Sequence, residues 1–446
     1  MNVHAFYDDG LSHLSYAILS AGEIALIDPA RNPGPYLEFA SNHDARITAI
    51  IETHPHADFV SSHLELHKLN NAPVYTSKAV GAGYPHIPFD DGERIRVGKV
   101  QLQAIHTPGH SPDSISILLS DKGEKPYAIF TGDTLFVGDV GRPDLRENVG
   151  NIRTEARELA RQLYHTTRNK LMTLPGDVIV YPAHGPGSLC GKNIGSELES
   201  TIGKEIRENY ALQPMSEQAF VSLILDQQPF VPKYFSYNVL LNKQGAPSYL
   251  SSLKKVPLLH NRQEMNPHVL VVDGRPAEKY RKGHLPGAIN IPIGLKFETW
   301  LGSVVSPNER FYLIADSEDQ RDILLAKAAK IGYELLVEAT LVVQSGPSVS
   351  ARFDIAHFAA HPNQYTVVDI RNDQEHAQGP IVKHALHIPL HELRERASEI
   401  PTDKPVAVHC AGGYRSAIGS SILTAVLPNT TVQDISTHIL DLNRAN

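Results

Sequence analysis

Cysteine is scarce in this chain of 446 residues, which contains only Cys190 and Cys410. Two cysteines cannot build a disulfide framework, so each is interpreted as a single thiol in a reducing compartment. The sequence also lacks any apolar run close to the roughly 18 residues that a membrane-spanning helix needs. Asp8 and Asp9 stand where a signal peptide would carry positive charge. We therefore expect a cytoplasmic protein without a membrane partner.

Runs of lysine and arginine are missing as well, and the formal net charge is -8 with a pI of about 6.3. This balance argues against a nucleic-acid partner. Hydrophobic residues make up 41% and charged residues 20%, the proportions of an ordinary globular protein. At roughly 150 residues per domain, the length favours about three domains.

Short segments rich in β-branched residues alternate with loops in the N-terminal part, which predicts strands. Four of these segments end directly in a histidine or an aspartate. They are "ITAIIETH", "VQLQAIHTPGH", "YAIFTGD" and "DVIVYPAHG", which end near His54, His110, Asp133 and His184. Residues 150–171 and 194–209 are predicted to be helical, and residues 212–267 are predicted to be a connecting region.

Metal ligation needs several histidine and aspartate side chains that converge from strand ends. The motifs THPHAD, TPGH, TGD and PAHG follow strands in this order, and together they resemble the metallo-β-lactamase fold, in which helices flank two β-sheets and metal lies at one edge. The resemblance implies two possible metal sites, one formed by His54, His56 and His110, and one formed by Asp58, residue 59 and His184, with Asp133 shared between them. Phe59 has no lone pair to donate, so a second metal would be one ligand short.

The segment FTGDTLFVGDVGRPDL, taken with THPHAD and TPGHSPDS, is similar to the persulfide dioxygenase branch of this fold. That resemblance implies one Fe(II) per chain, bound by His54, His110 and Asp133. Two imidazoles and one carboxylate leave adjacent open positions for O₂ and a low-molecular-weight thiol persulfide. The groups that would orient these ligands or bind water and substrate are His56, Asp58, Tyr181 and His184.

Two further residues near these motifs are candidates for substrate binding. The resemblance implies that Arg142 binds the anionic tail of the thiol substrate, and the alternative is an ion pair with Asp139 or Asp144. Cys190 lies in the Gly- and Pro-rich stretch HGPGSLCGK. Its thiol either faces the substrate or is buried and inert.

The C-terminal part contains an internal repeat. Each copy has the motif V-V-D-x-R, a glycine ten residues after the aspartate, and an Ile-Pro pair. The motif supplies Asp273 and Arg275 in the first copy, and Asp369 and Arg371 in the second. Each copy continues into a strand, a loop that ends in arginine, and an apolar helix. Strands that alternate with helices predict a parallel α/β unit of about 95 residues, present twice.

The loop HCAGGYRS places Cys410 after a strand and Arg415 before an apolar helix. Backbone N–H groups and a helix N-terminus in such a loop bind anions and lower a thiol pKa. The C-x₄-R spacing is shorter than the C-x₅-R of tyrosine phosphatases, and it resembles that of rhodanese sulfurtransferases. The resemblance implies catalysis by Cys410 and Arg415. The cradle for the sulfane sulfur would be formed by Ala411, Gly412, Gly413 and Tyr414.

The first copy lacks this nucleophile. Aligning Arg321 with Arg415 puts Asp316 at the position of Cys410, in the acidic loop DSEDQR. Asp316 is also suited to cap the helix that follows. We interpret this copy as catalytically inactive. The Asp–Arg pair of the V-V-D-x-R motif occurs in both copies, so we predict that it builds the fold and does not catalyse.

These observations predict a multidomain α/β chain, with a metallo-β-lactamase-like αββα sandwich followed by two rhodanese-like parallel α/β domains. The predicted domains are residues 1–250, which include a C-terminal connector, residues 251–347, the inactive rhodanese-like copy, and residues 348–446, the active copy. The whole chain resembles a persulfide dioxygenase–rhodanese fusion.

The resemblance implies a multifunctional enzyme of sulfide detoxification. The iron domain would convert RSSH and O₂ to sulfite and RSH, and the active rhodanese would combine sulfane sulfur with sulfite to give thiosulfate. One alternative is a dinuclear zinc thioester hydrolase fused to a sulfur carrier, and another is a binding protein in which Cys410 only carries sulfur to a partner. A homo-oligomer is expected. The thiol is left open among glutathione, coenzyme A, bacillithiol and cysteine.

Overall fold

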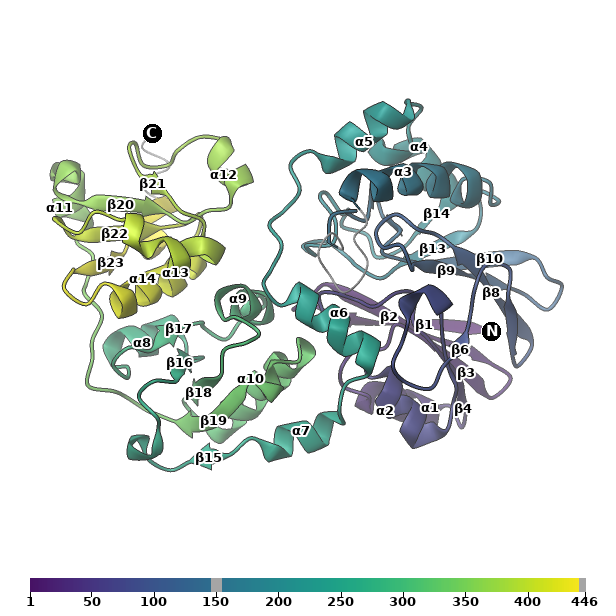
Figure 1. Cartoon of the computed structure of the whole chain (residues 1–446), viewed down its shortest axis with the longest axis horizontal. Helices are drawn as coiled ribbons and strands as arrows, with labels where there is room; N and C mark the ends of the chain where they lie inside the picture. The colour runs from purple at the N-terminus through teal and green to yellow at the C-terminus, as the bar shows by residue number, and fades with distance from the viewer. Residues whose placement is uncertain (146–154, 441–446) are drawn as a thin grey trace. The chain divides into compact units, whose positions relative to one another are not determined.

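The computed structural model describes residues 1–145 and 155–440, and the chain divides into two compact units (Figure 1). The first unit comprises residues 1–252 with 329–332, and the second comprises residues 253–328 with 333–446. Both repeat copies belong to the second unit, so the predicted boundary between residues 347 and 348 stays a prediction. Within the described ranges, no helix is long and apolar enough to cross a membrane.

Two six-stranded sheets form the centre of the first unit. The first sheet contains, in order, β1 (Asn2–Asp8), β2 (His13–Ser20), β3 (Glu23–Ile27), β4 (Arg46–Ile51), β5 (Val74–Thr76) and β6 (Ile87–Pro88). The second contains, in order, β14 (Ser200–Thr201), β13 (Ile179–Pro182), β10 (Pro126–Gly132), β9 (Ile115–Ser120), β8 (Val100–His106) and β7 (Arg94–Val97). A small hairpin joins β11 (Leu135–Phe136) to β12 (Asp139–Val140).

The main core lies between the two sheets. In β8, Val100, Leu102 and Ala104 are buried while the residues between them are partly exposed. These side chains belong to one apolar cluster with Tyr16 and Ile18 of β2. Because alternate residues of a strand point to opposite faces, one face of each sheet is left for the helices.

Helices cover the outer face of each sheet, as Figure 1 shows. The helices of this unit are α1 (Gly34–Asn42), α2 (His63–Asn70), α3 (Ala156–Thr166), α4 (Ile202–Glu208), α5 (Glu217–Leu225), α6 (Phe235–Gln244) and α7 (Tyr249–Lys255). Tyr36 and Leu66 pack on the first sheet, and Leu163 and Phe220 pack on the second. This four-layer arrangement confirms the predicted αββα sandwich.

The helix predictions for this unit were partly wrong. Helix α3 begins at Ala156 and continues as one π-helical turn over Thr167–Leu171, while residues 150–154 lie outside the described ranges. Residues 194–199 are not helical, because Ser200 and Thr201 pair with β13 and Thr201 then caps α4 through its hydroxyl. The predicted connecting region contains α5, α6 and α7, and Phe220 of α5 belongs to a core cluster of the domain.

The second unit holds two parallel sheets with the same strand order. The first sheet contains, in order, β15 (Leu258–Leu259), β19 (Val337–Val342), β18 (Phe311–Ala315), β16 (Leu270–Asp273) and β17 (Ile289–Asn290). The second contains, in order, β23 (Val432–Asp434), β22 (Val406–His409), β20 (Thr366–Asp369) and β21 (Leu386–His387). Apart from β15, the strands correspond one to one, which confirms the repeated parallel α/β unit.

Short helices connect these strands. They are α8 (Ala277–Lys282), α9 (Phe297–Val304), α10 (Glu318–Lys330), α11 (Ile355–Ala360), α12 (Asp373–Ala377), α13 (Leu393–Arg396) and α14 (Tyr414–Val426). In each copy a helix follows the first central strand directly, and the helix that contains Arg321 or Arg415, α10 or α14, follows the next central strand. The loop that contains Cys410 therefore lies at the carboxyl end of a parallel strand, where α/β folds place their sites.

Candidate metal centre and cysteine loop

Three side chains that the sequence predicts as metal ligands lie together in the first unit. His54 follows β4, His110 follows β8, and Asp133 follows β10, and all three are buried. The Oδ2 atom of Asp133 is 3.8 Å from His54 Nε2 and 3.5 Å from His110 Nε2. One ligand atom from each residue lies within 4.8 Å of the other two, a spacing at which one metal ion can be bound by all three.

The other ring nitrogen of each histidine determines its tautomer. His54 Nδ1 lies 3.0 Å from Thr53 Oγ1, and that hydroxyl donates to Asp28 Oδ2 at 2.8 Å. Because the hydroxyl proton points to Asp28, Thr53 accepts from His54 Nδ1–H. His110 Nδ1–H donates to the carbonyl of Arg142 at 2.9 Å. Both Nε2 lone pairs are therefore available toward Asp133, as a metal-binding histidine requires.

Gly132 allows this close arrangement. Its φ angle is +52°, and a Cβ atom at this position would lie 2.5 Å from Thr53 Oγ1. Any larger residue would push Thr53 away from His54, and it would also be strained in the left-handed region. Glycine at the end of β10 thus brings Asp133 next to the loop that carries both Thr53 and His54.

His184 and Asp58 form a second group on the other side of Asp133. His184 Nε2 lies 3.3 Å from Asp58 Oδ2 and 3.5 Å from Asp133 Oδ1, and its Nδ1–H donates to the carbonyl of Ser12. Burial lowers the pKa of His184, but the two carboxylates outweigh it and raise the pKa to about 9. The sulfur of Cys190 lies within 4.8 Å of ligand atoms from Asp58 and His184. Burial and the nearby carboxylates raise the pKa of this thiol well above its ordinary value.

An aromatic ring stands where a two-metal site would have a further donor. The buried ring of Phe59 lies 3.8 Å from the ring of His13 and 4.4 Å from the ring of His56, measured between centroids. His13 was not predicted from sequence, because it is the first residue of β2, whereas the predicted ligands follow a strand. The region beside His184 is therefore packed with rings on the side that Phe59 occupies.

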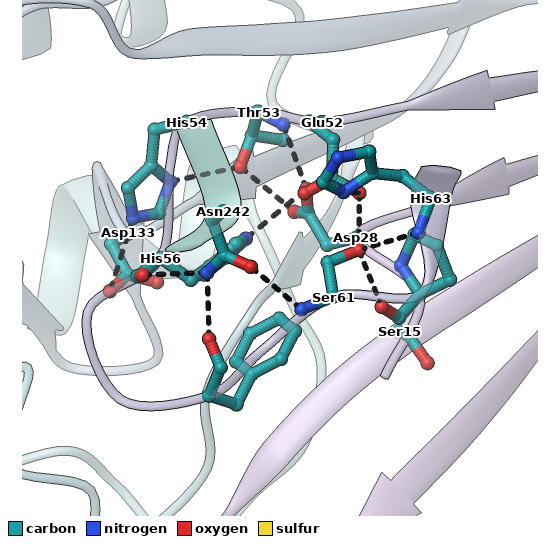
Figure 2. Close-up of polar contacts among 12 residues, drawn as sticks. Ser15, Asp28, Glu52, Thr53, His54, His56, Ser61, His63, Asp133 and Asn242 are labelled. Atoms are coloured by element: carbon teal, nitrogen blue, oxygen red, sulfur yellow. Dashed lines mark hydrogen bonds and ion pairs between the residues drawn. The ribbon is translucent and has the colours of Figure 1, made fainter. Parts of the chain in front are cut away.

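Figure 2 shows a buried polar network beside the loop of residues 54–61, called the metal loop below. Asp28 contacts both Thr53 and His56 in this network. Asp28 Oδ1 accepts from the backbone N–H of Thr53 at 2.7 Å and lies 3.2 Å from His56 Nε2. Glu52 accepts from Ser61 Oγ at 2.8 Å, and burial raises its pKa well above the ordinary value. The sequence signal for Asp28 was available, since "EIALID" is another predicted strand that ends in aspartate.

Asn242 of α6, which is distant from the metal loop in sequence, makes hydrogen bonds with its main chain. Its amide Nδ2 donates to the carbonyls of His56 at 2.8 Å and Phe59 at 2.7 Å. Its Oδ1 accepts from the backbone N–H of Ser61 at 2.8 Å. Three main-chain groups of one loop are thus satisfied by a single buried side chain, as Figure 2 shows. A helix predicted to be a connector is therefore part of the site.

Arg142 and Tyr181 are the remaining candidates of this domain. Arg142 is buried and forms a bidentate ion pair with Asp144, with Nε–Oδ1 and Nη2–Oδ2 distances of 2.7 and 2.6 Å. This is one of the two pairs expected as the alternative to substrate binding. Tyr181 packs on Phe130 and Tyr16 in the core between the sheets, where burial raises its pKa to about 12.

The cysteine loop of the second unit connects β22 to α14. Cys410 is buried, and its sulfur accepts from the backbone N–H of Gly413 at 3.1 Å. Gly413 has a φ angle of +97°, which turns the loop toward the sulfur at little steric cost. Ala411 and Gly412 are exposed, while the hydroxyl of Tyr414 donates to the carbonyl of Pro292 in the first copy. The backbone of this loop therefore faces the sulfur, as an anion-binding cradle does.

Arg415 lies in the first turn of α14 and forms a bidentate ion pair with Glu375. Its Nη2 donates to Glu375 Oε1 at 2.6 Å, and its Nη1 donates to the other carboxylate oxygen. Glu375 was not singled out from sequence, because it lies on α12, 40 residues before Arg415. Despite the cost of burial, the pair lowers the pKa of Glu375.

The equivalent loop of the first copy is arranged differently. Asp316 Oδ2 accepts from Lys279 Nζ at 2.5 Å, and the backbone N–H of Asp316 donates to Gln320 Oε1 at 2.8 Å. Asp273 pairs with Ile314 as Asp369 pairs with His409, so Ala315 is the counterpart of Cys410 and the predicted alignment of Asp316 with Cys410 was off by one residue. The Asp316 carboxylate lies one residue beyond that position and is paired. The predicted cap was wrong by one residue, because Ser317 Oγ accepts from the N–H of Gln320 in the first turn of α10.

The Asp–Arg pair of the V-V-D-x-R motif has the same geometry in both copies. The Nη2–Oδ2 distance is 2.6 Å for Arg275 and Asp273, and 2.7 Å for Arg371 and Asp369. In each copy the same Nη2 also donates at 2.9 Å to the carbonyl of the glycine eight residues later. An arrangement shared by a copy with a cysteine and a copy without one agrees with a role in the fold.

Comparison with known proteins gives the same division of the chain. Residues 8–184 match the Metallo-beta-lactamase superfamily, and residues 256–340 and 355–437 match the Rhodanese-like domain. The crystal structure of a metallo-beta-lactamase from Staphylococcus aureus subsp. aureus COL is 32% identical, with a TM-score of 0.69, over 77% of this chain and 99% of that chain. The chain belongs to the metallo-β-lactamase superfamily, as a member whose metallo-β-lactamase domain is followed by two rhodanese-like domains.

Two further proteins are similar to part of this chain. The human mitochondrial persulfide dioxygenase ETHE1 is 29% identical over 163 residues, which is 36% of this chain and 59% of that protein. The hydroxyacylglutathione hydrolase of Francisella tularensis subsp. novicida (strain U112) is also 29% identical, over 180 residues, 40% of this chain and 65% of that protein. The chain thus spans about three fifths of the length of these relatives. Because both relatives are 29% identical to this chain, sequence identity does not distinguish between their two reactions.

Proposed function

We propose that the metallo-β-lactamase domain is a persulfide dioxygenase with one Fe(II) held by His54, His110 and Asp133. The observation that carries the proposal is the convergence of two imidazole lone pairs on one carboxylate. Phe59 supports a single metal, because it fills the neighbouring donor position with a ring. Two histidines and one carboxylate are the ligand set of non-haem Fe(II) oxygenases. The similarity to human persulfide dioxygenase supports the same reaction.

The proposed first reaction is RSSH + O₂ + H₂O → RSH + SO₃²⁻ + 2 H⁺. It oxidises the sulfane sulfur and reduces O₂. When bound, iron supplies the position at which O₂ and the persulfide sulfur meet. The chain's own residues orient the site: Thr53 and the carbonyl of Arg142 hold the two histidine rings, and Asn242 holds the loop between His54 and Ser61.

The substrate is proposed to be a low-molecular-weight thiol persulfide that enters beside His184. The thiol of Cys190 is close to this group and would contact the substrate as an uncharged neighbour. Arg142 would bind the anionic tail of the substrate by exchanging the Asp144 carboxylate for the anionic group of the thiol. His56 and Asp58 would hold the polar surroundings of the ligands.

The second proposed reaction takes place at Cys410. Its thiolate attacks the sulfane sulfur of RSSH, which gives Cys410–S–SH and RS⁻. After the persulfide loses its proton, sulfite attacks the outer sulfur and leaves as thiosulfate, which restores the thiolate. The backbone N–H of Gly413 already faces the sulfur, and Arg415 supplies positive charge at the start of α14.

The decisive experiment measures metal content and O₂ uptake in protein purified without added metal. We expect about one iron per chain and O₂ consumption when a thiol persulfide is added. His54→Ala should lose both iron and O₂ uptake while Cys410 still transfers sulfur. Two bound zinc ions, with thioester hydrolysis and no O₂ uptake, would show that the proposal is wrong.

A dinuclear hydrolase is the second candidate, and Cys190 is the observation in its favour. Asp58, His184 and Cys190 form a group of three donors next to the first one, so a thiolate could replace the donor that Phe59 lacks. The similarity to a hydroxyacylglutathione hydrolase agrees with this alternative. Cys190→Ser separates the two, because it should lower metal content from two to one only if the thiol is a ligand.

A further inference from the structure

The two rhodanese-like copies differ at a position outside their shared motif. Six residues after the motif aspartate, the first copy has Lys279 and the second has Glu375. Both residues lie on the helix that follows the first central strand, α8 in one copy and α12 in the other. A cation in one copy thus replaces an anion in the other, although the neighbouring Asp–Arg pairs are the same.

In the second copy, hydrogen bonds to both the main-chain carbonyl and the side-chain carboxylate hold Glu375 in place. Its carbonyl accepts from Arg371 Nη1 at 3.1 Å, and its Oε2 accepts from the backbone N–H of Asn372 at 3.0 Å. The same carboxylate binds both terminal nitrogens of Arg415. Arg415 is therefore fixed at the cysteine loop by a carboxylate that is itself fixed to the fold.

In the first copy, Arg321, which the sequence alignment matches to Arg415, has a different partner. Lys279 binds Asp316 in the loop after β18, and Arg321 forms its ion pair with the adjacent Asp322. The Asp322 side chain is 66% exposed, whereas that of Glu375 is 33% exposed. With lysine in place of glutamate at position 279 of α8, Arg321 pairs with an exposed neighbour along its own helix.

We propose that Glu375 is a positioning residue for sulfur transfer, which holds Arg415 where the acceptor oxyanion binds. The inference rests on the proposed activity of Cys410 and extends it to a residue on another helix. The ion pair uses one N–H of Nη1 and one of Nη2 of Arg415, so the guanidinium still has the Nε–H and one N–H on each terminal nitrogen with which to bind a sulfite oxygen. Glu375 and Cys410 are both replaced in the first copy, while the Asp–Arg pair is kept. This joint replacement separates Glu375 from the residues that only build the fold.

The step that Glu375 supports is Cys410–S–S⁻ + SO₃²⁻ → Cys410–S⁻ + S₂O₃²⁻. The sulfite lone pair forms the new S–S bond, and the electron pair of the broken S–S bond leaves on Cys410 Sγ. Two anions meet in this step, so a positive group in a defined place lowers its barrier. A mobile Arg415 would supply the same charge with less effect, because orientation contributes to catalysis.

The test compares two acceptors with the full-length protein. Glu375→Gln keeps the shape of the side chain but removes its charge. With sulfite as acceptor, we expect kcat/KM to fall about tenfold, mainly through KM. With cyanide, which has no oxyanion for Arg415 to bind, the rate should stay within about twofold. Glu375→Asp should recover part of the sulfite activity, since it restores the charge.

Lys279→Gln is the matched control, because it changes the same position in the inactive copy. It should leave both acceptor activities unchanged. The proposal is overturned if Glu375→Gln uses sulfite as well as or better than the parent protein, or if it loses both acceptors together with thermal stability. The first result would mean that the carboxylate does not help Arg415, and the second would mean a purely structural role.

The parent protein and Cys410→Ser are measured first, so that failure of the proposed function is recognised separately. If the parent transfers no sulfur, or if Cys410→Ser transfers it equally well, the assignment of Cys410 is wrong. If Cys410 is required and Glu375→Gln behaves as the parent does, only the inference about Glu375 is wrong.

Discussion

At the scale of single residues, the metal centre depends on side chains outside the ligand motifs. The ring of His54 is oriented through Thr53, which in turn is bound by Asp28 at the end of β3. A chain of two hydrogen bonds therefore decides which nitrogen of His54 can bind metal. Groups of this kind usually contribute substantially to metal affinity.

Thr53→Val tests this chain of hydrogen bonds. The change keeps the β-branched shape and removes the hydroxyl that joins His54 to Asp28. We expect Fe(II) affinity to fall by about 10- to 100-fold, as is typical when the group that orients a ligand histidine is removed. Competition with a chelator, followed by the iron content per chain, measures the change.

Thr48→Val is the matched control for this prediction. Thr48 lies on β4, is half-buried, and its hydroxyl donates only a long 3.5 Å bond to the carbonyl of Ile24. Its replacement should leave Fe(II) affinity unchanged. Equal affinity in Thr53→Val and the parent protein would show that His54 does not need this partner.

At the scale of secondary-structure elements, helix α6 determines the shape of the metal loop. Asn242 makes hydrogen bonds with main-chain groups of residues 56, 59 and 61, which are more than 180 residues away in the sequence. A loop with buried backbone groups needs such partners, because an unsatisfied group is costly. The helix thus stabilises the loop although it contributes no ligand.

Asn242→Ala should destabilise the first unit by about 2–4 kcal/mol, since it leaves several buried main-chain groups unpaired. Urea unfolding measures this loss, and the iron content should fall with it. Asn238, one turn earlier on α6, is the control. Its buried amide makes no hydrogen bond within residues 1–145 and 155–440, so Asn238→Ala should cost under about 1 kcal/mol. Similar losses in the two variants would contradict the role of Asn242.

The loop that carries Asp316 in the first copy gives a second prediction at this scale. Asp316→Ala removes an ion pair with Lys279, whose side chain is 51% exposed. Such a pair contributes about 0–1 kcal/mol, so stability should change little. O₂ uptake and thiosulfate formation should both remain at parental rates. Loss of sulfur transfer in a folded Asp316→Ala protein would mean that the first copy takes part in the reaction.

At the scale of the whole molecule, two proposed reactions share one chain. Sulfite is the proposed product of the iron domain and the proposed acceptor at Cys410. Joining the two domains raises the local concentration of one product near the other site, by an amount that the connection sets. The two proposed reactions can be measured separately in the intact chain, because one consumes O₂ and the other forms thiosulfate.

Cys410→Ser tests this coupling through the identity of the product. With persulfide and O₂ supplied, the parent protein should release mainly thiosulfate. The serine variant should consume O₂ at the parental rate and release sulfite, because a hydroxyl is a far weaker nucleophile than a thiolate. Products are compared at equal O₂ consumption, after subtraction of the uncatalysed exchange between sulfite and persulfide.

Two outcomes would contradict this prediction. Thiosulfate formation at the parental rate by Cys410→Ser would show that the second copy is not the sulfurtransferase. Complete loss of O₂ uptake in a folded, iron-loaded Cys410→Ser protein would show that the two reactions are not separable.

The sequence by itself determined the order of domains and located the candidate metal ligands and the cysteine loop. Ligand motifs at strand ends, such as those of His54 and Asp133, are local patterns in which periodicity and residue type suffice. The repeat was also visible, because V-V-D-x-R recurs and the spacing from its aspartate to the later arginine is similar, 415 − 369 = 46 residues in the second copy and 321 − 273 = 48 in the first. The helix over residues 194–209 was misjudged, because strand pairing with β13 overrode local propensity.

Only the tertiary structure decided which residues support these sites. Asn242 reaches the metal loop from α6, and Glu375 reaches Arg415 from α12, and neither contact leaves a periodic signal in the sequence. The same holds for Cys190, whose place beside Asp58 and His184 follows from the folding of a loop. Contacts between distant segments depend on how layers pack, whereas motifs depend on neighbours along the chain. The physical reason is that burial brings polar groups together in space without regard to their separation in sequence.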